Sequence, residues 1–322
     1  MAPRTFGIEL ELILPAATDR YVLARELNAA GVATTVENYN HQTRNHWKIV
    51  TDASVPGGCE VVSPVLSGEA GLAQARTVCQ VLNRLGCRVN RNCGFHVHIG
   101  AQELNATQCC RLAELYRSNE RHIDAFMPPS RRNGQYCRAL LNGDLSACRT
   151  IGEVCLQLTG GSRYYKLNLQ ALQRHGTVEF RQHSGTLNAA KVIHWITLCQ
   201  AMVELASRDT SPDRLPEAIR LTGKAAICVE LATRPGGCTT ADIRQATGWT
   251  KTGGFNHAIR RAGLVLRKVR EGRTVRYFAT QPQPTVAVGP AETLDHFLTR
   301  VGLDAGQRNY FLNRAAHFAS RS

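Results

Sequence analysis

The chain has 322 residues and carries 39 Lys and Arg against 25 Asp and Glu, which gives a formal net charge of +14. The length favours one large domain with a smaller one, or two domains of comparable size. The charge favours polyanionic partners such as nucleic acid, nucleotide phosphates or acidic substrates. No apolar run approaches the roughly 18 residues that a membrane span needs, so we expect no membrane partner. The twelve cysteines form no C-x-x-C pair and the N-terminus lacks the features of a secretory signal, so we expect buried thiols in a cytoplasmic protein, without disulfides or a zinc cluster.

Residues 1–210 are predicted to form an α+β domain with several antiparallel strands and helices on one side. Alternating patterns and turn sequences predict strands over 5–14, 46–55, 59–66, 87–100, 163–172 and 176–185. Apolar residues at helical spacing predict helices over 18–30, 68–85, 105–126 and 188–207.

The chain changes character after a linker at 211–220 that is rich in Pro, Asp and Ser. Residues 221–280 contain three short helical patterns, at 225–234, 239–248 and 250–263, and then two strand patterns around a glycine turn. This order is the plan of a winged helix-turn-helix domain. Residues 281–322 read as a second linker and a helical tail that packs on either domain or mediates dimerisation.

Two carboxylates, Glu9 and Glu11, lie two residues apart on the first predicted strand. Their side chains therefore point to one face, while the neighbouring Ile and Leu residues point to the other. A solvated strand explains such a pair, whereas a buried pair needs a cation to offset its charge.

Glu179 and Arg181 repeat this geometry on the strand predicted over 176–185. They fit an exposed ion pair, or a metal-binding carboxylate beside a guanidinium that holds a phosphoryl group. His96 and His98 also share one strand face, which suits a structural role as well as ligation or catalysis.

Asp52, Ser54 and Glu60 bracket a Gly-Gly turn, and a polar hairpin end explains them as well as a site does. The whole set is more informative than its members, because a sheet face with several carboxylates, two histidines and an arginine cannot form a hydrophobic core. It can form a site where divalent cations hold a nucleotide polyphosphate.

Five segments in order resemble the amidoligases over residues 5 to 205. They are FGIELEL, the Trp47–Asp52–Ser54 spacing followed by GGCEVVSP, CGFHVHIG, RYYKLNLQAL and TVEFRQHSGTL. Amidoligases belong to the carboxylate–amine ligases, with glutamine synthetase and glutamate–cysteine ligase. The resemblance implies a curved antiparallel sheet whose concave face binds ATP and divalent metal. We expect two Mg²⁺ ions, because magnesium is abundant and suits phosphate chemistry. It also implies that a carboxylate is phosphorylated by ATP and that an amine then displaces phosphate to leave an amide.

The resemblance also implies roles for individual residues. It places metal ions on Glu9, Glu11, Glu60, Glu179 and His96, with His98 rather than His96 on the phosphates. It assigns ATP contacts to His98, Arg163 and Arg181, catalysis to Asp52 and Arg181, and substrate contacts to Ser54, Arg131, Tyr164 and Asn168. Arg131 and Arg132 lie in a basic loop that suits a mobile cover over the nucleotide or an acidic substrate, or a solvated loop.

The second domain would bind DNA or RNA through its third helix, or mediate protein contacts. The nucleic-acid candidates are Lys251, Asn256, Arg260 and Arg261, with a basic strand pair behind them. Three functions compete: an ATP-dependent amide ligase acting on small-molecule or peptide carboxylates and amines, a metal-dependent hydrolase or nuclease, and a DNA-binding regulator with a degenerate ligase domain.

Overall fold

The computed structural model describes residues 4–52, 55, 57–208, 223–234, 236–249, 253–261, 264–271, 274–280 and 292–320. The chain forms two compact units. The first joins residues 1–208 to 292–322, and the second spans 209–291. The tail predicted at the C-terminus therefore belongs to the first unit.

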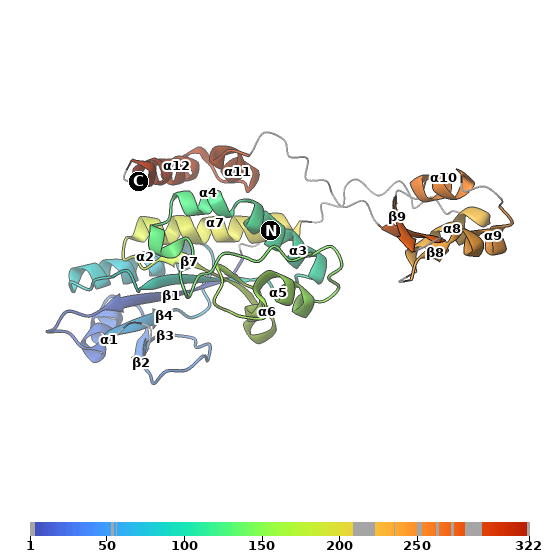
Figure 1. Ribbon diagram of the computed structural model, residues 1–322. Coiled ribbons are helices and arrows are strands. Elements are labelled where there is room, and N and C mark those ends of the chain that lie inside the picture. The colour runs from blue at the N-terminus through green and yellow to red at the C-terminus, as the bar shows by residue number, and fades with distance from the viewer. Residues whose placement is uncertain are drawn as a thin grey trace. The chain divides into compact units, whose positions relative to one another are not determined.

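A seven-stranded sheet forms the centre of the first unit, in the order β2-β3-β4-β1-β5-β7-β6 (Figure 1). The strands are β1 Phe6–Ile13, β2 Thr34–Val36, β3 Trp47–Thr51, β4 Gly58–Val62, β5 Gly94–Gly100, β6 Leu167–Asn168 and β7 Thr177–Ser184. The α+β prediction is confirmed. The antiparallel sheet that the resemblance implies is wrong at one edge, because β2 and β3 pair in parallel and make the sheet mixed. The helix α1 (Arg20–Ala29) carries the chain from β1 towards this edge.

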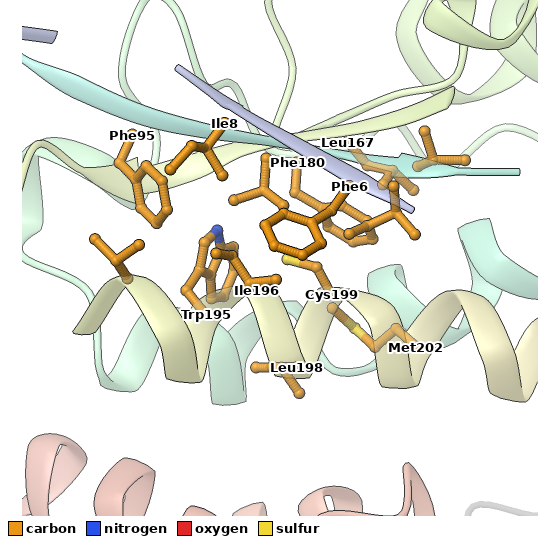
Figure 2. Close-up of a cluster of buried hydrophobic side chains, with 14 of the residues drawn as sticks. Phe6, Ile8, Phe95, Leu167, Phe180, Trp195, Ile196, Leu198, Cys199 and Met202 are labelled. Atoms are coloured by element: carbon orange, nitrogen blue, oxygen red, sulfur yellow. The ribbon is translucent and has the colours of Figure 1, made fainter. Parts of the chain in front are cut away.

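The apolar face of the sheet packs on α7 (Ala189–Ser207) and forms the main core. Figure 2 shows Phe6, Ile8, Phe95 and Phe180 directed from the strands towards α7, with Trp195 and other α7 side chains between them. All of these side chains are buried. Burial of each large apolar side chain contributes about 1.5–3 kcal/mol, so this face stabilises the sheet and leaves the opposite face available for polar groups.

The other helices of the first unit include α2 (Gly68–Arg84), α3 (Ala106–Ser118), α4 (Glu120–Ala125), α5 (Ile151–Thr159) and α6 (Gln170–His175). The single helix predicted over 105–126 is split at Asn119. There the side-chain amide donates to the Leu115 carbonyl at 2.9 Å, and the backbone turns to φ −109°. A side chain that bonds the preceding turn competes with the helix in this way.

Two predicted strands are shorter than expected. In the segment 87–100 only Gly94–Gly100 is a strand, because the Asn90 side chain accepts from the Asn92 and Cys93 amides and makes a turn. In the segment 163–172 only Leu167–Asn168 pairs with β7. The Asn168 side chain then accepts from the Gln170 amide at 3.0 Å and starts α6.

The C-terminal helices α11 (Leu294–Arg300) and α12 (Ala305–Ala319) pack on the outer side of α7. Leu198 points away from the sheet towards them (Figure 2). The rings of His194 and Tyr310 stack at 3.9 Å, and Arg314 donates to the Phe126 carbonyl at 3.1 Å. The sheet, α7 and the tail thus make successive layers.

The second unit contains α8 (Lys224–Thr233), α9 (Thr240–Thr247), α10 (Gly253–Arg261) and a three-stranded antiparallel sheet. Its strands are β8 Cys238–Thr239, β9 Val265–Glu271 and β10 Thr274–Thr280, in the order β8-β10-β9. Three helices and a hairpin were predicted, and β8 was not. A separate core that includes Leu231, Ile243, Phe255 and Tyr277 holds these elements together.

All twelve cysteines are free thiols, and Cys110 alone is only half-buried, as expected for small apolar residues. Within the described ranges, no helix is both long and apolar enough to cross a membrane.

Candidate functional site

A pocket of about 1090 Å³ lies on the polar face of the seven-stranded sheet. Strand alternation creates this face, because Ile8 and Leu10 are buried in the core while Glu9 and Glu11 line the pocket. The register places Glu11 opposite Glu60 on β4 and places Glu9 opposite His96 on β5. Residues far apart in the sequence thus meet on three adjacent strands, β4, β1 and β5.

Glu9 lies between the two histidines of β5. Its carboxylate is 3.0 Å from His96 Nδ1 and 3.3 Å from His98 Nε2. Burial opposes its ionisation, but the hydrogen bonds with His96 and His98 outweigh burial and hold the pKa of Glu9 well below its usual value. Burial lowers the pKa of His98 and the bond with Glu9 raises it, with a net increase. Glu9 is therefore an anion that two imidazoles stabilise.

Gly94 allows Glu11 and its neighbours to converge. Its amide donates to Glu11 Oε2 at 2.7 Å. A Cβ atom at this position would lie 2.7 Å from His96 Nε2 and 3.0 Å from Arg131 Nη2. Real Cβ contacts are essentially never shorter than 3.0 Å, so a larger residue here would displace the His96 side chain, and Gly94 leaves room for it.

Glu179 and Arg181 form a buried ion pair, and Asn168 donates to the second Glu179 oxygen at 2.6 Å. Burial raises the pKa of Glu179, but the Arg181 and His98 charges outweigh it and the net pKa is lowered. The predicted shared face is confirmed for this pair. The strand β7 has a β-bulge here, because two of its residues, Arg181 and Gln182, lie opposite the single residue His96 of β5.

Glu60 is surrounded by other carboxylates. Burial, together with Glu9, Glu11 and Asp52, raises its pKa well above the usual value. A bound cation would remove this cost. The described part of the chain offers three triads whose ligand atoms lie within 4.8 Å of one another: Glu11–Asp52–Glu60, Glu9–His98–Glu179 and Glu9–Glu60–His96.

The donor atoms of these triads fit divalent cations. The Glu11–Asp52–Glu60 triad has only carboxylate oxygens, the ligands that Mg²⁺ prefers. Each of the other two adds one imidazole, and both contain Glu9. His96 and His98 thus both lie where a metal could be held, and Glu9 and Glu11 can serve different ions.

The wall of the pocket beyond the triads is aromatic and basic. The Arg163 guanidinium lies over the Tyr164 ring at 5.1 Å, and Arg181 lies 5.9 Å from the same ring. The ring of Tyr136 meets that of Tyr164 at 5.5 Å. This wall can hold anionic or planar groups.

Arg131 lies inside the pocket wall, which corrects its expected place in a mobile covering loop. Its side chain is 4% exposed and donates to the Arg181 carbonyl at 2.7 Å and to the Gln182 carbonyl at 3.2 Å. These bonds secure the backbone of β7 at the bulge. Arg132 donates to the Met127 carbonyl at 3.1 Å.

Several predicted residues cannot be placed. Ser54 and Lys251 lie outside the described residues, and so do the side chains of Arg260 and Arg261, whose backbone is in α10. Asn256 is half-buried on α10. These five stay predictions.

Lys48 and Thr177 also belong to the site but were not predicted. Lys48 lies on β3 in the pocket lining, and Thr177 bonds His98 Nδ1 at 3.0 Å. Each has a sequence signal: Lys48 alternates with core residues directly after Trp47, and Thr177 precedes the Glu179–Arg181 pair by the strand period of two.

One family model matches the chain, described as "Putative amidoligase enzyme", over residues 2–203. No curated protein matches the chain. The described residues that line the polar pocket run from Arg4 to Arg181, so all of them lie inside the matched range. The family description implies formation of amide bonds at the expense of ATP. The chain therefore belongs to the amidoligase family, a family of amide-forming ligases.

Proposed function

We propose that the first unit joins a carboxylate to an amine through an acyl phosphate, with ATP as the phosphoryl donor. The observation that carries this proposal is the arrangement of the three triads beside the Glu179–Arg181 pair in one pocket. Phosphoryl transfer requires cations and a guanidinium around the transferred group. This pocket supplies carboxylates for the cations and Arg181 for the phosphoryl oxygens.

The chemistry follows from the poor reactivity of a carboxylate towards amines. A carboxylate oxygen of the acid substrate attacks the γ-phosphorus of ATP, and the bond to the bridging oxygen breaks to release ADP. The amine nitrogen then attacks the acyl carbon, the bond to the phosphate oxygen breaks, and the amine loses a proton. The products are one amide, one ADP and one phosphate.

We assign roles to the residues from their positions. Glu11, Asp52 and Glu60 would hold one magnesium ion, and Glu9, His98 and Glu179 would hold another. Bound magnesium would neutralise phosphate charge. Arg181, which pairs with Glu179, would bind the phosphoryl group. Besides its place in the first triad, Asp52 would orient the amine or accept its proton. Arg163, Tyr164 and Asn168 would contact ATP or the acid.

The test is to incubate the protein with ATP, Mg²⁺ and mixed carboxylates and amines, and to measure ADP, phosphate and product mass. The ligase requires the three products in equal amounts. Turnover without ATP would indicate the hydrolase or nuclease, and nucleotide binding without ADP release would indicate the regulator. The Arg181→Ala variant is the control for a contaminating ATPase. If its preparation forms ADP as fast as the wild type does, the ADP comes from another enzyme.

We further propose that residues 221–280 act as a winged helix that binds DNA or RNA. Support comes from exposed cations on the strand β9, namely Arg267, Lys268 and Arg270, and from the exposed His257 on α10. A basic strand next to a helix suits contacts with phosphates.

Replacing Arg267, Lys268 and Arg270 together by Ala is expected to weaken duplex binding about tenfold or more at moderate salt. The salt slope should fall by about 3, since each lost phosphate contact lowers it by about 1. Fluorescence anisotropy with labelled DNA measures both quantities. Arg25, Arg76 and Arg84 of the first unit, all exposed, give a matched triple variant that should bind as the wild type does. Equal binding of heparin and DNA by the wild type would refute the proposal.

A further inference from the structure

The segment of residues 37–46, here called the strap, joins β2 to β3 and forms part of the wall of the polar pocket. Its residues Tyr39 to Thr43 line the pocket. The strands β2 and β3 lie at one edge of the sheet, whereas Arg163 precedes β6 at the other edge. The strap and Arg163 nevertheless line the same pocket. The pKa of Arg163 is raised mainly by the bond with Tyr164, and Tyr39 of the strap makes the smallest of the contributions that raise it.

Lys48 of β3 anchors the centre of the strap through hydrogen bonds. Lys48 is 4% exposed, and its ammonium donates to the Gln42 carbonyl at 2.7 Å, to Asn40 Oδ1 at 2.9 Å and to the Asn40 carbonyl at 3.1 Å. An ammonium has three N–H donors, so these bonds use them all. A buried cation with this many bonds is costly to separate from its partners.

A second group of polar bonds, centred on Glu37, connects the two ends of the strap. Glu37 accepts from Arg44 at 3.0 and 3.1 Å, lies 3.0 Å from His46 Nε2, and accepts from the Asn40 amide at 2.9 Å. Arg44 is the main cause that holds the pKa of Glu37 at about 2. Asn40 is thus bonded to both Lys48 and Glu37, so the polar bonds of the strap form one connected network.

We infer that Lys48 is a positioning residue, which holds the strap over the acid substrate so that the amine, and not water, reaches the activated carboxylate. The inference rests on the proposed function, because an acyl phosphate is the species that water would destroy. If water attacks the acyl carbon, the bond to the phosphate oxygen breaks and the free acid returns. ADP and phosphate then form without amide, and a covered site prevents this loss.

The first experiment tests the anchor without any assay of activity. Limited trypsin digestion, followed by mass spectrometry of the fragment that ends at Arg44, is compared between the wild type and Lys48→Met. Cleavage after Arg44 is expected to be about tenfold faster or more in Lys48→Met, because digestion follows the population of the open segment. Should Lys48→Met fail to fold, Asn40→Ala removes one acceptor of the same ammonium from a loop position. Asn38→Ala is the control, since Asn38 enters the network through its backbone carbonyl.

The second experiment measures the ratio of ADP to amide. In Lys48→Met we expect this ratio and the KM for the acid to rise several-fold. Lys48→Arg should restore part of the coupling, because a guanidinium can also donate to the strap carbonyls.

Two results would overturn the inference. One is unchanged cleavage after Arg44 in both Lys48→Met and Asn40→Ala. The other is a large loss of kcat for ADP formation with the strap still resistant, which would mean that Lys48 acts on the phosphates directly. If the wild type forms no ADP, the proposed function fails, and the digestion still decides whether Lys48 anchors the strap.

Discussion

The Glu9→Gln variant is expected to form ADP about two to three orders of magnitude more slowly than the wild type, the loss typical of removing one group that stabilises transition-state charge. Glu9 belongs to two of the three triads, so one substitution removes an anionic ligand from both. It also replaces the partner of His96 and His98 by a neutral amide. The initial rate of ADP release at saturating ATP and Mg²⁺ measures the loss.

The control for this variant is Glu69→Gln on α2, an exposed carboxylate that faces Arg76 at 3.9 Å. It changes the net charge equally and should keep the wild-type rate. The circular dichroism spectrum and melting temperature of Glu9→Gln show whether the fold survives. A folded Glu9→Gln variant with a wild-type rate would contradict the assignment of Glu9 as a shared ligand.

The polar face could be predicted from the sequence because strand alternation is a local property. Glu9 and Glu11, His96 and His98, and Glu179 and Arg181 each lie two residues apart, so each pair shares a face wherever its strand lies. The register between the strands then decides which pairs meet. That register depends on long-range pairing, and only the structure places Glu11 opposite Glu60.

The strap and Arg131 could not be predicted for the same reason. The strap sequence ENYNHQTRNH is polar throughout and reads as an ordinary loop. Its role depends on Lys48, whose burial follows from packing and not from a local pattern. Arg131 looked like a solvated cation beside Arg132, yet it is buried because β7 bulges at Arg181 and offers two carbonyls there.

The short strand β6 shows where a local signal outweighed the pattern. The apolar alternation in RYYKLNLQAL favours a long strand, but the side chain of Asn168 makes two hydrogen bonds that end the strand. Its amide donates to Glu179 and its carbonyl oxygen accepts from the Gln170 amide. The residue that completes the site therefore also ends the strand.

The Glu60→Gln variant is expected to be more stable than the wild type without metal and less responsive to Mg²⁺. The folded-state pKa of Glu60 is raised by burial and by Glu9, Glu11 and Asp52. A raised pKa gives stability that is fully present below the unfolded pKa and is lost as pH rises through the folded pKa. The melting temperature of Glu60→Gln in EDTA should thus exceed that of the wild type by about 4 °C at a pH of about 8, the shift that roughly 1–2 kcal/mol produces in a unit of this size. The gap should close as the pH falls to about 4, below the unfolded pKa of a glutamate.

The difference between the two proteins isolates Glu60 from other groups that titrate over this range. His98 also has a raised pKa, so its stability contribution falls with rising pH in the same direction, but it is present in both proteins. Added Mg²⁺ should raise the melting temperature of the wild type more than that of Glu60→Gln, because binding to the folded state stabilises it. If Glu60→Gln melts below the wild type in EDTA at the higher pH, the Glu60 carboxylate does not destabilise the metal-free fold and the prediction is wrong. If Glu60→Gln melts higher, the clustered carboxylates lower the stability of the metal-free protein. Such a loss of stability is expected where residues are arranged to bind cations rather than to stabilise the fold.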